Sequence, residues 1–148
     1  MQEIIVDGGD VEFFTRPKEY KQQLLLLIKN ARQRIFITAL YLQDDDAGKE
    51  VLSALYQAKA NFPELVVNIF VDFNRGQRGL IGEEASLGNR ELYLKLADTY
   101  PQTINIYGVA VKRKEVFGVL HLKGMVFDNQ VFYTGASIND IYMQQGDR

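Results

Sequence analysis

The sequence contains no cysteine, and it contains a single histidine among 148 residues. The absence of cysteine excludes disulfide bonds and thiolate metal sites, as is common for proteins of the reducing cytosol. No apolar run approaches the roughly 20 residues that a transmembrane helix needs, and residues 1–16 lack the basic-then-apolar order of a signal peptide. We therefore expect a cytoplasmic chain that meets a membrane only at its surface.

An excess of positive charge is also missing. The formal net charge is −2 and the isoelectric point is about 5.4, which argues against a general nucleic-acid binder with a basic surface. Hydrophobic residues make up 47% of the chain and charged residues 24%, which is ordinary for one globular domain with its own core. We find no internal repeat, linker or low-complexity tract, so one domain over residues 1–148 is expected.

Hydrophobic patterning predicts alternating strands and helices. Strands are expected at 11–14, 35–42, 65–73 and 104–107. Helices are expected at 17–33 and 89–100, and another helix is expected to begin at a cap, Asp45 or Asp46, and to end at residue 59. A hairpin is expected to follow residue 118, and the apolar stripe of the first helix is assigned to the core. The near-continuous apolar run at 65–73 suits a strand buried on both faces. The fold class is therefore α/β, with a mixed sheet between helical layers.

The histidine, His121, stands in a pattern that points to catalysis. Without its neighbours it would by default be a structural or surface residue. Lys123 follows two positions later, and if residues 120–123 are extended, both side chains point to the same side. A neutral imidazole is a nucleophile, and a neighbouring ammonium stabilises the negative charge of a phosphoryl transition state. This layout requires no metal ion and no cofactor.

Three further residues accompany the pair, and each has a structural and a functional interpretation. Asp128 completes the spacing H-x-K-x4-D as a candidate catalytic residue, but it also begins a tight turn between two apolar runs, and a mainly structural role is favoured. Ser137 to Asp140 has the pattern of a capping box at the start of a short helix, and a helix N-terminus can bind phosphate. Ser137 and Asn139 are therefore candidate phosphate-binding residues.

Together these residues resemble the signature of the phospholipase D superfamily, called HKD, and the matching positions are His121, Lys123, Asp128, Gly135, Ser137 and Asn139. More narrowly, residues 72–82, 118–124 and 135–140 resemble the N-terminal half of bacterial phosphatidylserine synthases of that superfamily. The likeness covers most of residues 10–148. It implies a phospholipase D-like catalytic half-domain that carries one HKD motif.

The resemblance also implies a reaction. In that family a phosphatidyl group moves from cytidine diphosphate-diacylglycerol (CDP-diacylglycerol) to L-serine through a phosphatidyl-histidine intermediate, and cytidine monophosphate (CMP) is released. His121 would be the nucleophile, and the enzyme would act at the membrane surface. The resemblance further implies that a carboxylate orients His121 from about as far downstream as Asp147.

One histidine is not enough for this chemistry. In-line displacement at phosphorus needs a nucleophile on one side and a proton donor for the leaving group on the other. A second half-site must come from a C-terminal repeat, as in the synthases, or from a second copy of the chain, as in single-motif nucleases of the superfamily. Three function classes remain open: half of a phosphatidyltransferase, a homodimeric phosphodiesterase or nuclease, and a non-catalytic module.

Three further clusters of charged residues lie elsewhere in the sequence. Arg75 and Arg78 lie in a glycine-containing loop after the strand at 65–73, where ligands of open α/β sheets bind, and they are candidate contacts to phosphate or nucleotide. Residues 112–114, Lys-Arg-Lys, face either anionic lipid headgroups or solvent. Residues 44–46, three aspartates, are assigned to capping of the following helix rather than to a metal site.

Overall fold

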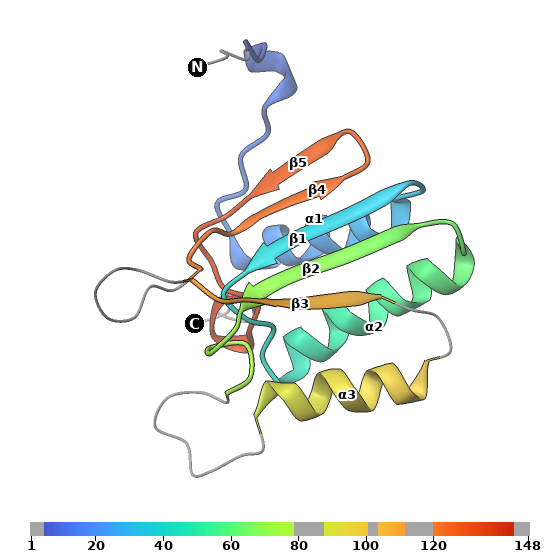
Figure 1. Cartoon of the computed structure of the whole chain (residues 1–148). Helices are drawn as coiled ribbons and strands as arrows, with labels where there is room; N and C mark the ends of the chain where they lie inside the picture. Colours follow the sequence, from blue (N-terminus) through green and yellow to red (C-terminus); the bar gives the residue numbers. More distant parts are fainter. Residues whose placement is uncertain (1–4, 79–87, 101–103, 112–119, 144–148) are drawn as a thin grey trace.

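A computed structural model describes residues 5–78, 88–100, 104–111 and 120–143 of the chain (Figure 1). The strands are β1 (Arg34–Ala39), β2 (Val66–Asp72), β3 (Asn105–Val109), β4 (Gly124–Phe127) and β5 (Gln130–Tyr133). The helices are α1 (Pro17–Asn30), α2 (Asp46–Asn61), α3 (Asn89–Thr99) and α4 (Asp140–Met143), and a 3-10 turn, η1 (Gly8–Asp10), precedes them. The order of elements agrees with the expected alternation.

The five strands form one sheet in the order β3-β2-β1-β4-β5. β1, β2 and β3 are parallel neighbours, whereas β4 pairs antiparallel with β1 and with β5. Ile37 in β1 lies at the centre of this register, opposite Ile69 on one side and Met125 on the other. The α/β class with a mixed sheet flanked by helices is therefore confirmed.

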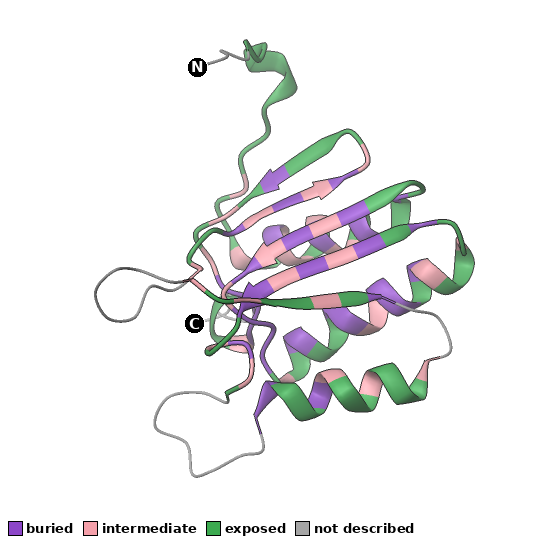
Figure 2. Ribbon diagram, in the orientation of Figure 1, coloured by how far each residue is buried: buried purple, intermediate pink, exposed green. Residues whose placement is uncertain are grey.

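One face of the sheet carries the core. Its buried side chains are Ile35, Ile37, Val67, Ile69, Met125 and Phe127, and they pack with buried residues of α1, α2 and α3. Figure 2 shows the resulting alternation of buried and partly exposed positions along β1 and β2. The prediction that β2 is buried on both faces is wrong in the described structure, because Val66 is exposed and Asn68 and Phe70 are only partly buried.

The other face carries apolar side chains without full cover. Phe70 of β2 stacks on Tyr107 of β3, with ring centroids 5.3 Å apart. On β5, Val131 is 77% exposed and Tyr133 is 73% exposed. In the register of the hairpin, Val131 lies opposite Val126, so both belong to this second face. The described chain therefore leaves part of an apolar sheet surface open to solvent.

The N-terminal region differs from its prediction. Residues 11–14 form no strand, and Phe13 is 84% exposed, because no described strand offers hydrogen-bond partners to this segment. α1 follows with Pro17 at its first position, where the missing N–H costs no hydrogen bond. Its apolar stripe is in the core as predicted: Leu24, Leu27, Ile28 and Ala31 are buried and Leu25 packs against them.

α2 begins as predicted. The Asp45 carboxylate accepts a hydrogen bond from the N–H of Gly48 at 2.9 Å, so Asp45 is the N-cap. Asp44 instead pairs with Lys49, 2.9 Å between Oδ1 and Nζ. Gly48 approaches the preceding turn so closely that a Cβ would lie 1.8 Å from the carbonyl oxygen of Gln43. The carboxylates at 44–46 thus organise the start of the helix.

Candidate active site

The sequence-predicted site residues gather at one edge of the sheet. β1, β2 and β5 all run towards the left side of Figure 1, and β4 begins there. Four segments therefore meet at this edge: the ones that follow β1, β2 and β5, and the one that precedes β4. They supply, in that order, Tyr41, Arg75, the Ser137–Asn139 segment and the His121–Lys123 pair.

His121 and Lys123 meet in the folded chain. Lys123 Nζ lies 3.4 Å from His121 Nε2 and donates a hydrogen bond to the carbonyl oxygen of Gly135 at 3.0 Å. Residues 120–123 are not part of a strand, since β4 begins at Gly124, yet the two side chains point to the same place. Because an ammonium only donates, the contact is a hydrogen bond when Nε2 accepts, with the imidazole proton on Nδ1.

The two side chains differ in their exposure. Lys123 is 7% exposed, so its charge sits at the base of the site, whereas His121 is exposed to solvent and accessible to a substrate. A fixed buried cation beneath an accessible imidazole is the arrangement that an anionic transition state requires. The pair can therefore provide a nucleophile and electrostatic stabilisation at one point.

Asn139 holds the segment after β5 in place. Its Oδ1 accepts a hydrogen bond from the N–H of Tyr142 at 3.1 Å, and its Nδ2 donates to the hydroxyl of Tyr41 at 3.3 Å. Asn139, and not Ser137, is therefore the N-cap of α4, and the predicted capping box is wrong in its register. α4 has only four residues, so its N-terminus is not a phosphate site by itself. Ser137 is buried next to Asn139.

Arg75 lies within the site, but Arg78 is farther along the loop. The Arg75 guanidinium carbon lies 5.3 Å from the centre of the Tyr41 ring, within the range of a cation–π contact. Arg78 is exposed, and its backbone N–H donates to the carbonyl oxygen of Arg75 at 3.3 Å. Through Tyr41, Arg75 is connected to Asn139, whereas no described contact connects the Arg78 side chain to these residues.

Asp128 lies at the other end of the sheet. Its carboxylate accepts hydrogen bonds from the N–H groups of Arg32, Gln33 and Arg34 at 2.8–2.9 Å, just before β1 begins. The length of β4, roughly 13 Å, separates it from Lys123. Asp128 also has a positive φ of 51°, as its place in the two-residue turn requires. Its candidate catalytic role is therefore corrected to the structural one, because its carboxylate is turned to backbone donors.

The same contacts explain the ionisation of Asp128. Burial raises the pKa of this carboxyl, but hydrogen bonds from the backbone N–H groups of Arg34, Gln33 and Arg32 outweigh the burial. The pKa is held below its ordinary value of 3.8. The carboxylate thus stays charged while it fastens the β4–β5 turn to the start of β1.

Sequence reasoning missed two residues of this site, Tyr41 and Asp72. Tyr41 connects Arg75 with Asn139, and Asp72 accepts hydrogen bonds from the loop of Arg75 and from Leu120. A signal for Asp72 was present, since a carboxylate directly ends an apolar strand. Residues 112–114 and Asp147 lie outside the described residues. Within the described ranges, no three His, Cys, Asp or Glu side chains are grouped so that they could hold a metal ion.

A family model described as "Cardiolipin synthase, PLD-like domain" matches residues 24–140, which include both β1 and the HKD segment. The chain belongs to this PLD-like family. The crystal structure of phosphatidylserine synthase from Haemophilus influenzae Rd KW20 matches 98% of the chain with a TM-score of 0.88 and 41% sequence identity. NucT from Helicobacter pylori matches 88% of the chain and 74% of its own, with a TM-score of 0.61 and 16% identity, which supports the PLD-like fold alone.

Among relatives of known sequence, CDP-diacylglycerol–serine O-phosphatidyltransferase PssA of Escherichia coli K12 is 47% identical over 140 residues, which is 94% of this PLD-like chain. The chain spans about a third of the length of such relatives: 31% of the E. coli protein and 32% of the H. influenzae structure. The similarity therefore covers one part of a longer enzyme in each case.

Proposed function

We propose that this PLD-like chain is the N-terminal half of a phosphatidylserine synthase, a phosphatidyltransferase that moves a phosphatidyl group from CDP-diacylglycerol to L-serine. The observation that carries the proposal is the accessible His121 imidazole 3.4 Å above the buried Lys123 ammonium. The similarity to enzymes named for this reaction, at 41–47% identity, supports the choice of substrates.

In the proposed mechanism, His121 attacks the phosphorus of the phosphatidyl group. The bond between this phosphorus and the CMP oxygen breaks, and CMP leaves with a proton from the acid of the second half-site. The serine hydroxyl then attacks the phosphatidyl-histidine, loses its proton to the same group and restores His121. Lys123 stabilises the negative charge on the oxygens of phosphorus in both transition states, and Arg75 binds a phosphate of the substrate.

The residues at 1–148 would form one catalytic half-domain with one HKD motif. The only histidine of the chain serves as nucleophile, so the acid must come from another polypeptide segment. We place it in a C-terminal repeat of the same protein; a second copy of this chain is the alternative source. The open apolar face of the sheet, which carries Val131 and Tyr133, supports an interaction with further protein.

We place the reaction at the cytoplasmic surface of a membrane, where its lipid substrate resides. In the part of the chain that the structure describes, no helix combines the length and the apolar composition needed to cross a bilayer. Peripheral contact would then bring the lipid headgroup to the exposed His121. No nucleic acid is expected as a partner, given the net charge of −2.

Trapping of the covalent intermediate tests this function. A protein that contains this chain together with the second half-site is mixed with CDP-diacylglycerol labelled in the phosphatidyl group, and the reaction is stopped with denaturant at high pH, where phosphohistidine survives. We expect label on His121 in the unmodified protein. The His121→Ala variant should carry no label, and its turnover should be lower by at least about 10³-fold. Asp128→Asn is the matched control and should still be labelled. Label on the His121→Ala protein would refute the assignment.

A further inference from the structure

Asp72 is a buried carboxylate at the end of β2, only 1% exposed. One of its oxygens, Oδ1, accepts hydrogen bonds from the N–H groups of Asn74 at 3.0 Å and Arg75 at 2.8 Å. The other, Oδ2, accepts one from the N–H of Leu120 at 2.9 Å. Both oxygens therefore bind backbone, and they bind two segments that lie 45 residues or more apart in the sequence.

These two segments carry the two halves of the proposed site. Leu120 directly precedes His121, so its hydrogen bond fixes the backbone from which the nucleophile projects. Arg75 begins the loop that is expected to bind phosphate, and the bond to its N–H fixes where its side chain starts. The Asp72 backbone adds a fourth hydrogen bond, because its carbonyl oxygen accepts from the N–H of Gly76 at 2.7 Å.

The Arg75 side chain is guided further by Tyr41. Its guanidinium lies over the Tyr41 ring, and the Tyr41 hydroxyl accepts from Asn139. The ring is buried, so it gives Arg75 a fixed surface instead of a mobile one. Asp72 and Tyr41 thus restrain both ends of Arg75, while Asp72 also restrains the segment of His121.

We propose that Asp72 is a positioning residue that sets the distance between the His121 nucleophile and the phosphate-binding Arg75. The inference rests on the proposed roles of these two residues. A phosphoryl transfer needs the nucleophile in line with the phosphorus while the phosphate oxygens are held, and a misplacement of about 1 Å can cost about 100-fold in rate. The Asp72 carboxylate binds both segments, so it fixes the position of the nucleophile relative to the group that holds the phosphate oxygens.

The chemistry of this contact requires a carboxylate. An ionised carboxylate only accepts, and all three of its backbone partners are N–H donors. In Asp72→Asn, one oxygen becomes an NH2 group that faces an N–H donor. Either the Leu120 contact or the Asn74 and Arg75 contacts must then break, and the two segments are no longer held by the same group.

His121 provides a direct probe, because it is the only histidine of the chain. The ring signals of a histidine-labelled protein, recorded by NMR through a pH titration, report on His121 alone. We expect Asp72→Asn to shift or broaden these signals in the folded protein. Asp128→Asn is the matched control, since Asp128 also accepts three backbone N–H bonds but lies at the opposite end of the sheet. It should leave the ring signals of His121 unchanged.

Hydrogen exchange in the unmodified chain gives a second measurement, which holds even if Asp72→Asn does not fold. The amides of Leu120 and Arg75 should exchange at least about tenfold more slowly than unprotected loop amides. In Asp72→Asn both should lose protection, whereas the amide of Phe73, which donates to the carbonyl oxygen of Val109, should keep it. Free exchange of Leu120 in the unmodified chain would overturn the proposal.

Turnover separates positioning from stability. In a protein with both half-sites, Asp72→Asn should lower kcat about 10- to 100-fold while its Tm falls no more than that of Asp128→Asn. Unchanged His121 signals and unchanged kcat would overturn the role of Asp72 even if His121 is labelled by substrate. Conversely, absence of label on the unmodified protein would refute the proposed function, whereas altered His121 signals in Asp72→Asn would still establish the positioning contact.

Discussion

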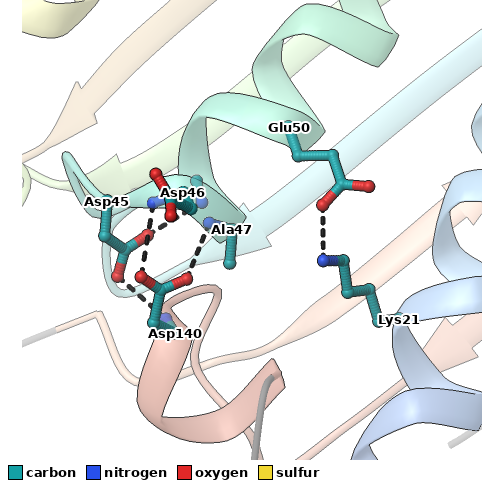
Figure 3. Close-up of polar contacts among 7 residues, drawn as sticks. Lys21, Asp45, Asp46, Ala47, Glu50 and Asp140 are labelled. Carbon is teal, nitrogen blue, oxygen red and sulfur yellow. Dashed lines mark hydrogen bonds and ion pairs between the residues drawn. The ribbon is translucent and has the colours of Figure 1, made fainter.

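Asp45 and Asp140 bind the starts of each other's helices. The N–H of Asp140, at the beginning of α4, donates to Asp45 Oδ2 at 2.8 Å, while the Asp140 carboxylate accepts from the N–H of Ala47 in α2 at 2.8 Å (Figure 3). Each carboxylate thus caps donors that a helix start leaves unsatisfied. Since Asn139 precedes α4 directly, this exchange anchors one side of the candidate active site to α2.

We expect Asp140→Ala to lower the free energy of unfolding by about 1–2 kcal/mol, because backbone N–H groups at the start of α2 lose their acceptor. The measurement is urea unfolding followed by far-ultraviolet circular dichroism. Glu50→Ala is the control: Glu50 forms an ion pair with Lys21 between α2 and α1, and a partly exposed pair contributes at most about 1 kcal/mol. Equal losses in the two variants would show that the exchange adds nothing beyond a surface ion pair.

Lys123→Met tests the charge of the buried lysine. Methionine keeps most of the apolar stem, so we expect a small change in Tm but a loss of kcat on the order of 10²- to 10³-fold, because in the proposed mechanism the ammonium stabilises the transition state. Steady-state kinetics in a protein with both half-sites and thermal unfolding are compared for the same variant. A loss of activity that follows only the loss of folded protein would assign Lys123 to stability instead.

The candidate site could be predicted from the sequence only where its reactive residues lie close together along the chain. His121 and Lys123 are two residues apart, and their meeting depends on local geometry alone, although the segment is not a strand. The carboxylate that ends the apolar strand was a signal for Asp72, but its partner Leu120 could not be assigned from the sequence, and neither could the contact of Tyr41 with Asn139, because these contacts join segments 48 to 98 residues apart. Such contacts depend on strand order, and the sequence contains no local mark of it.

The fold shows the same division. Helix starts at Pro17 and Asp46 were predicted because capping and proline preferences act locally. The strand expected at 11–14 failed, since a short apolar segment becomes a strand only where a neighbouring strand accepts it. The expectation that β2 is buried on both faces was wrong, because apolar composition does not show whether another polypeptide segment covers a face of the sheet.

The two arginines of the loop should differ in their effect. Arg75→Ala should raise the KM for CDP-diacylglycerol several-fold, because its guanidinium lies over Tyr41 within the site. Arg78→Ala should change KM less, since the Arg78 side chain is exposed and has no described contact with the other site residues. Both constants are measured with the lipid dispersed in the same detergent micelles. Equal KM values for Arg75→Ala and the unmodified enzyme would show that Arg75 does not bind the substrate and is an ordinary residue of a solvated loop.

Asp128 should contribute stability that depends on pH. Its pKa in the folded chain lies below the ordinary value of 3.8, so its stabilisation is complete above about pH 5 and is lost as the pH falls through the folded pKa. Asp128→Asn should therefore lower Tm at neutral pH and weaken the dependence of Tm on acid as the pH falls below the ordinary pKa of 3.8. An acid dependence identical to that of the unmodified chain would contradict this account.

The isolated chain of 148 residues should be catalytically incomplete. Its single histidine can be the nucleophile or the acid at one phosphorus, but not both, so we expect negligible transfer of phosphatidyl groups to serine. Mixing it with the C-terminal half of a close relative, such as the E. coli synthase, should restore transfer, and His121→Ala should abolish that gain.

The open sheet face predicts some self-association, which Tyr133→Lys should reduce, as measured by sedimentation. Strong turnover by the isolated chain that rises with the concentration of dimer would instead identify a homodimeric phosphodiesterase, in which two copies of His121 complete one site.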